Sequence, residues 1–230
     1  IVNYFCSLYN IVKLEIERKD IIMRRTRLYS YDEYMKEVFQ VYKDERLENY
    51  YYSLIKDFLL TFCSDKAKVV NVSGNHQTNL HDRKIYADKG ELQDLIIVPS
   101  EYTYEQPMRP FISVEIKKPS IDIDFDSETG KAEIKCYNSK KVKISTDNLN
   151  GQVEVQFAKT DCIIFTDCIS WWFLEREHND TKEFLQEPRL FQLIEVSGQD
   201  WRILQSNSTV WENMGDYIRS FIERSQRDYK

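Results

Sequence analysis

The feature that most constrains the fold is a short apolar segment near the middle of the chain, FISVEIKKPS, at residues 111–120. Its composition predicts a β-strand over 111–118 that ends before Pro119. Glu115 and Lys117 lie two residues apart in this strand, so their side chains leave the same face. Buried strands rarely carry charged side chains that have neither a partner nor a function. The segment therefore predicts a strand of the sheet that also carries a functional site.

A second strand is predicted at residues 92–99, LQDLIIVP, with Asp94 near its start. If the two strands are neighbours in a sheet, Asp94 converges with Glu115 and Lys117 at one edge. Two carboxylates and the backbone carbonyl of Ile116 form an oxygen-rich set that suits Mg²⁺ or Mn²⁺. A lysine beside such an ion can hold the attacking water or stabilise charge on a phosphoryl oxygen. This is the chemistry of phosphodiester hydrolysis.

The rest of the sequence alternates between helical and extended patterns. The clearest helix is expected at 44–62, with a buried stripe of Leu47, Tyr50, Tyr51, Leu54, Ile55, Phe58, Leu59 and Phe62. Further helices are expected at 31–42, 150–159 and 209–224. Further strands are expected at 66–74, 162–167, 170–175, 189–197 and 201–206.

This order of elements predicts an α/β fold in which helices pack on the faces of a central sheet. The expected organisation is one domain at 31–230 behind an N-terminal extension at 1–30. Residues 120–148 have an acidic half and a basic half around Gly130. They are expected to form a β-hairpin inserted into the domain or to be partly disordered.

Composition limits the classes of function. The net charge of −6 gives no argument for a basic nucleic-acid clamp, but an acidic balance is compatible with a metal-dependent enzyme. The five cysteines include no Cys-x-x-Cys pair, which indicates reduced thiols in a cytoplasmic protein. No apolar run approaches the roughly 18 residues of a membrane span, so no membrane partner is expected. The first residue is Ile1, so additional domains in a longer chain are an open alternative, as is a homodimer.

The segments QDLIIV and SVEIKKP resemble the PD-(D/E)xK nuclease superfamily, with Gln93 in place of the proline of the motif. CIIFTDCISWWFLE is similar to a strand–turn–strand in the nuclease domains of type I and related restriction enzymes. The resemblance covers roughly residues 44–175. It implies a restriction-endonuclease-like central mixed β-sheet flanked by helices. It also implies that Asp94 and Glu115 bind the metal and that Lys117 serves the nucleophile.

The resemblance implies two further site residues. Glu48, on the helix before the first strand of the sheet, would complete the metal site, with Glu45 as the alternative one turn earlier. Gln152, on the helix after the strand with Glu115, would help to position metal, water or DNA. Gln156 lies one turn later, so the register of this glutamine stays open.

Contacts with nucleic acid are expected from a basic cluster and from a polar loop. The cluster KKVK contains Lys140, Lys141 and Lys143, and the loop before the second strand carries His76 and His81. Each set can contact phosphates, and each can instead be an ordinary solvated surface.

Together these features predict a Mg²⁺- or Mn²⁺-dependent endonuclease that hydrolyses DNA in bacterial or phage restriction or defence. One alternative is a nuclease of the same fold that acts on RNA or on single-stranded or branched DNA. Another is an inactive module that binds nucleic acid. In a third, purely structural reading, Glu115 and Lys117 form an ordinary salt bridge.

Overall fold

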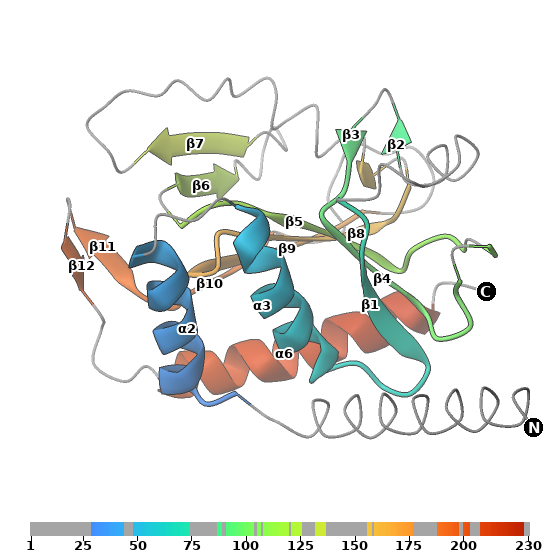
Figure 1. Ribbon diagram of the computed structural model, residues 1–230, viewed down its shortest axis with the longest axis horizontal. Coiled ribbons are helices and arrows are strands. Elements are labelled where there is room, and N and C mark those ends of the chain that lie inside the picture. Colours follow the sequence, from blue (N-terminus) through green and yellow to red (C-terminus); the bar gives the residue numbers. More distant parts are fainter. Residues whose placement is uncertain are drawn as a thin grey trace, which may run out of the picture.

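The structure is a computed structural model, shown in Figure 1. It describes residues 29–43, 48–73, 87–88, 91–103, 105–106, 108–119, 121–125, 132–136, 156–157, 159–176, 188–197, 200–202 and 208–227. Within these residues the fold is mixed α/β, with a central sheet flanked by helices. This confirms the fold class at that level.

The central sheet has six strands in the order β1-β4-β5-β8-β9-β10. Their bounds are Ala67–Asn71 for β1, Leu95–Pro99 for β4, Ile112–Ile116 for β5, Cys162–Thr166 for β8, Ser170–Glu175 for β9 and Arg189–Gln192 for β10. Neighbouring strands are antiparallel, except that β5 and β8 run parallel. The sheet is therefore mixed. The two strands on which the sequence argument depends, β4 and β5, are neighbours in its middle.

Three two-stranded sheets accompany the central one. They are formed by β2 (Ala87–Asp88) with β3 (Glu91–Leu92), by β6 (Ile121–Phe125) with β7 (Ala132–Cys136), and by β11 (Glu195–Ser197) with β12 (Asp200–Arg202). The antiparallel pair β6–β7 is a hairpin that follows directly from the end of β5. It lies within residues 120–148, for which the sequence allowed either a hairpin or partial disorder.

Within the described residues, three helices pack against one face of the central sheet, α2 (Tyr31–Lys43), α3 (Asn49–Leu60) and α6 (Ser208–Arg227) (Figure 1). Ile112, Val114 and Ile116 of β5 belong to this core. Because side chains alternate along a strand, Ser113 and Glu115 turn to the opposite face. That face has a smaller apolar cluster, formed by Val70, Val72, Ile96, Val98 and Tyr102.

The buried side of α3 differs from the expected stripe chiefly in its tyrosines, while Phe62 is half-buried and Leu47 lies outside the described residues. Tyr50 was expected to be buried but is 50% exposed, whereas Tyr52 is buried. Successive residues of a helix are separated by about 100° around its axis. The core-facing arc runs through Tyr51 and Tyr52, which leaves Tyr50 on the solvent side. Tyr52 thereby points towards the end of the sheet where Asp94 lies.

The segment 189–197 also differs from its prediction, because it is not one strand. It divides into β10 and β11, which belong to different sheets. The break falls at Leu193 and Ile194, which are fully buried, and the amide of Leu193 donates a hydrogen bond to the carbonyl of Ile169. None of the helices in the described ranges is long and apolar enough to cross a membrane.

Candidate active site

Asp94 and Glu115 lie opposite each other at one end of the sheet. In the register of β4 and β5, Leu95 pairs with Val114. One further step places Asp94 opposite Glu115, and opposed residues of an antiparallel pair share a face. Asp94 Oδ2 also accepts a hydrogen bond of 2.8 Å from the backbone amide of Ile116. This bond fixes the first carboxylate against the strand that carries the second.

Both oxygens of the Glu115 carboxylate have a partner. Lys117 Nζ lies 2.5 Å from Oε1, and Gln156 Nε2 lies 2.6 Å from Oε2. The contact with Lys117 requires both side chains to leave the same face of the strand, as their spacing predicted. Glu115 itself is only 4% exposed. The strand therefore carries a buried, charge-assisted network.

Gln156 comes from the segment that precedes β8, and two residues that follow it, Phe157 and Thr160, anchor this segment. The guanidinium of Arg176 lies 4.2 Å from the centre of the Phe157 ring, a cation–π contact. The hydroxyl of Thr160 donates a 2.7 Å hydrogen bond to the carbonyl of Phe111, just before β5. These contacts hold Gln156 against Glu115.

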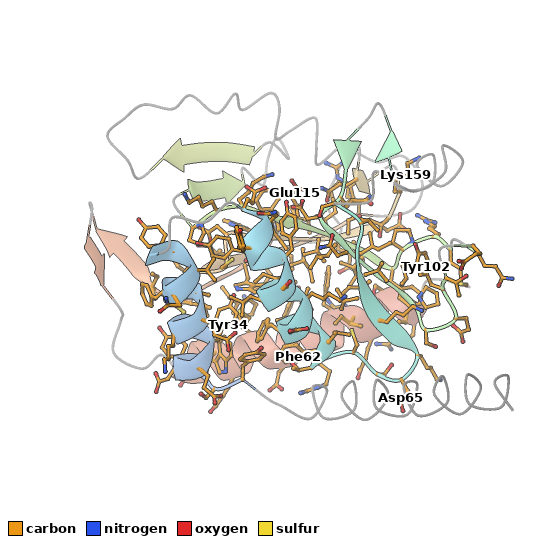
Figure 2. The ribbon with its side chains drawn as sticks, viewed as in Figure 1. Tyr34, Phe62, Asp65, Tyr102, Glu115 and Lys159 are labelled. Carbon is orange, nitrogen blue, oxygen red and sulfur yellow. The ribbon has the colours of Figure 1, made fainter. Side chains whose placement is uncertain are left out.

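Glu48 lies directly before the first residue of α3 and adds a third carboxylate. Its Oε1 lies 3.4 Å from the hydroxyl of Tyr52, one turn further along the helix. It also accepts a hydrogen bond from the backbone of Lys118, next to Lys117. Figure 2 shows Glu115 beside the first turn of α3, so the helix and both central strands reach the same end of the sheet.

Burial raises the pKa of all three carboxylic acids, and repulsion by Asp94 adds to the rise for Glu48 and Glu115. The pKa of Glu115 rises from 4.5 to about 7, first because the group is buried and then because Asp94 lies nearby, although Lys117 lowers it. Burial raises the pKa of Asp94, which hydrogen bonds from Tyr52 and Ile116 and the charge of Lys117 partly offset.

Glu48 and Lys117 complete the electrostatic picture. Burial raises the pKa of Glu48, and the charge of Lys117 opposes this rise. Burial alone would lower the pKa of Lys117, but the nearby carboxylates, Glu115 foremost, raise it above its usual value. Lys117 is thus held in its protonated form.

These four groups are not balanced in charge. Three carboxylates, Glu48, Asp94 and Glu115, share one ammonium group, Lys117. When all four are ionised, two negative charges are left over within the set. Buried charges are usually paired because isolated ones are costly. The arrangement therefore suits a divalent cation better than it suits a closed salt bridge.

The residues that would hold such a cation are two carboxylates and a carbonyl. In the part of the chain that the structure describes, no group of three or more His, Cys, Asp and Glu side chains is arranged to hold a metal ion. A set formed by Asp94, Glu115 and the backbone carbonyl of Ile116 does not need a third side chain. All its ligands are oxygens, which Mg²⁺ and Mn²⁺ prefer.

Several predicted site residues cannot be compared with the structure. Gln152, His76, His81, Lys140, Lys141 and Lys143 lie outside the described residues, as does Glu45. Among the described residues, the glutamine that contacts Glu115 is Gln156, the alternative one turn after Gln152. Its Oε1 is buried and has no hydrogen-bond partner among the described residues.

Tyr52 is a residue that the sequence argument missed. It belongs to the site through Glu48 and Asp94. The signal that could have found it is its spacing, because residues four apart on a helix are neighbours on one face.

Comparisons of the chain with known protein families, with curated proteins and with solved structures gave no match.

Proposed function

We propose that this protein is a Mg²⁺- or Mn²⁺-dependent endonuclease of the PD-(D/E)xK type, which hydrolyses phosphodiester bonds of DNA. The observation that carries the proposal is the unbalanced cluster at the end of the sheet. Three buried or half-buried carboxylates from three elements meet one lysine there. A closed structural salt bridge would pair charges one to one, and this cluster does not.

The residues present fit a divalent ion. Asp94, Glu115 and the carbonyl of Ile116 would hold it, and Glu48 would add negative charge beside them. When bound, the ion supplies positive charge to a phosphoryl oxygen and lowers the pKa of water. The excess of negative charge in the cluster and the oxygen-only donor set both support this assignment.

Lys117 acts as a hydrogen-bond donor in this proposal. Its pKa is raised, so it stays protonated and does not take a proton from water. Its ammonium group holds the attacking water and stabilises the charge that develops on the phosphoryl oxygen. Gln156 orients Glu115 through its Nε2. Its Oε1, which has no hydrogen-bond partner among the described residues, can accept a hydrogen bond from the same water.

DNA is the proposed substrate, in a bacterial or phage restriction or defence system, because the order of the strand segments resembles nuclease domains of restriction enzymes. RNA and single-stranded or branched DNA are the substrates that the test must separate from duplex DNA.

The test is a cleavage assay on plasmid DNA, single-stranded DNA and RNA, in Mg²⁺, in Mn²⁺ and in EDTA. The variants are Asp94→Asn, which keeps an acceptor for the amide of Ile116, and Lys117→Ala. Lys118→Ala is the matched control, because the adjacent lysine leaves the opposite face of the strand and its backbone bond to Glu48 is retained.

We expect metal-dependent cleavage by the wild type and by Lys118→Ala, and none by the other two variants. Cleavage that survives EDTA, or that survives both Asp94→Asn and Lys117→Ala, contradicts the proposal. Tight DNA binding without cleavage by any form assigns the protein to the inactive binding modules instead.

A further inference from the structure

Tyr52 is fixed at both ends. Its ring belongs to the main apolar core, together with Tyr51 and Ile55 of the same helix, and the residue is 8% exposed. Its hydroxyl leaves the core at the acidic end of the sheet and lies 3.4 Å from Glu48 Oε1. A side chain held in this way places its hydroxyl at a defined point.

The same hydroxyl serves two carboxylates that come from different elements. Its single hydrogen can be donated to Asp94, directly before β4, or to Glu48, directly before α3. The two carboxylates repel each other. A hydroxyl that lies beside both, and donates to one of them at a time, reduces this repulsion and keeps the two carboxylates close together.

A hydroxyl donor leaves room for a cation. Each ionised carboxylate offers about four lone-pair sites. Asp94 uses one of them on the amide of Ile116 and another on Tyr52. The remaining lone pairs can bind a metal. Hydrogen bonds from outside the ligand set commonly orient metal-binding carboxylates, and their loss typically lowers metal affinity or activity by about 10- to 100-fold.

We propose that Tyr52 is a positioning residue of the metal site, which joins Glu48 to Asp94 and thereby sets the affinity of the site for a divalent cation. This inference rests on the proposed function, because it needs a cation at the cluster. It adds that the phenol of Tyr52, which touches neither cation nor substrate, determines the concentration of metal at which the site fills.

Tyr51 provides a matched control one residue earlier. It is also buried in the core, but its hydroxyl has no hydrogen-bond partner among the described residues. Replacing Tyr51 or Tyr52 by phenylalanine removes one oxygen and keeps the ring. The two variants therefore make the same chemical change, and only Tyr52→Phe removes a contact with the acidic site.

The experiment is a calorimetric titration of the full chain with Mn²⁺, for the wild type, Tyr51→Phe and Tyr52→Phe. Thermal unfolding in EDTA checks that each variant is folded. We expect Tyr52→Phe to bind Mn²⁺ about tenfold more weakly, with Tyr51→Phe equal to the wild type. In the cleavage assay, Tyr52→Phe should need about tenfold more Mn²⁺ for half-maximal rate and recover most of its rate at saturation.

The two proposals fail in different ways. Equal Mn²⁺ affinity for the wild type and Tyr52→Phe, or an equal loss in Tyr51→Phe, overturns the role of Tyr52 and leaves the metal site standing. A wild type that binds no Mn²⁺ overturns both. If Tyr52→Phe binds Mn²⁺ as tightly as the wild type but its cleavage rate stays low at saturating Mn²⁺, Tyr52 does not act by positioning the metal ligands.

Discussion

Asp167 and Glu115 are both buried carboxylic acids, Asp167 directly after β8 and Glu115 in the neighbouring β5, yet they meet different partners. Asp167 Oδ1 accepts hydrogen bonds from the amides of Ile169 and Ser170, at 3.1 and 2.7 Å. Glu115 faces two further carboxylates and shares one lysine with them. Backbone donors around a carboxylate shape a turn, whereas repulsion among carboxylates is not needed for any turn or strand. Asp167 therefore stabilises a turn of the fold, whereas Glu115 belongs to the candidate site.

Glu115→Gln should separate these roles most strongly. It keeps the shape of the side chain but removes its charge, so we expect cleavage to fall by about 10³-fold, in the range seen when one key electrostatic group is lost. The free energy of unfolding at pH 8 should stay equal or rise, because the variant no longer buries an ionised carboxylate beside Asp94. Single-turnover cleavage and urea unfolding measure the two quantities. A large loss of stability with normal cleavage would reverse the assignment.

The pH dependence of stability is the second expected effect. The pKa of Glu115 is raised in the folded state, from 4.5 to about 7, so the folded protein binds more protons than the unfolded chain between these values. The stabilising effect of the protonated form is present below pH 4.5 and is lost as pH rises through 7. At 1.36 kcal/mol per pKa unit, this amounts to a loss of at most about 3 kcal/mol.

Urea unfolding without metal, between pH 4 and 8, measures this loss. Asp94 and Glu48 have pKa shifts in the same direction and add to it. In Glu115→Gln the fall between pH 4.5 and 7 should be smaller than in the wild type. A fall of equal size in both proteins would show that Glu115 is not the titrating group.

Asp167→Ala should have the opposite profile to Glu115→Gln. It leaves the amides of Ile169 and Ser170 without their acceptor, which costs about 1–3 kcal/mol for buried donors. Cleavage per folded molecule should be unchanged. Chemical unfolding and an active-site-normalised rate check this, and a variant of normal stability that cleaves poorly would move Asp167 into the site.

Gln156→Leu should give the smallest effect. It removes the donor to Glu115 Oε2 but leaves the carboxylate in place, so we expect about a tenfold loss of cleavage at fixed metal concentration. Gln152→Leu is the control for the alternative register. If Gln152→Leu loses activity and Gln156→Leu does not, the glutamine was assigned to the wrong turn.

The sequence predicted the parts of the molecule that depend on local pattern. Short runs rich in apolar residues predicted β4, β5, β8 and β9, and the two-residue spacing placed Glu115 and Lys117 on one face. The sequence pattern placed Tyr50, and not Tyr52, on the buried side of α3, because three tyrosines occur in a row and the pattern does not distinguish them. Only packing against the sheet distinguishes Tyr52 from Tyr50.

The sequence alone could not predict which glutamine contacts Glu115 or where β10 ends. Gln152 and Gln156 are four residues apart in the sequence, so a helical periodicity treats them alike. The contact of Arg176 with Phe157 and the bond of Thr160 to Phe111 hold Gln156 beside Glu115, and both are long-range contacts. The end of β10 likewise depends on a bond to Ile169, far away in the chain.

The central claim is that the carboxylates around Lys117 form a site for a divalent cation. Thermal unfolding in Mn²⁺ and in EDTA, for the wild type, Glu115→Gln and Asp167→Ala, tests it most directly. A ligand that binds only the folded state adds about 2.7 kcal/mol at a hundred times its dissociation constant, or roughly 5–10 °C for a chain of this size. We expect Mn²⁺ to raise the melting temperature of the wild type and of Asp167→Ala but not of Glu115→Gln. No shift in the wild type, or an equal shift in Glu115→Gln, would contradict it.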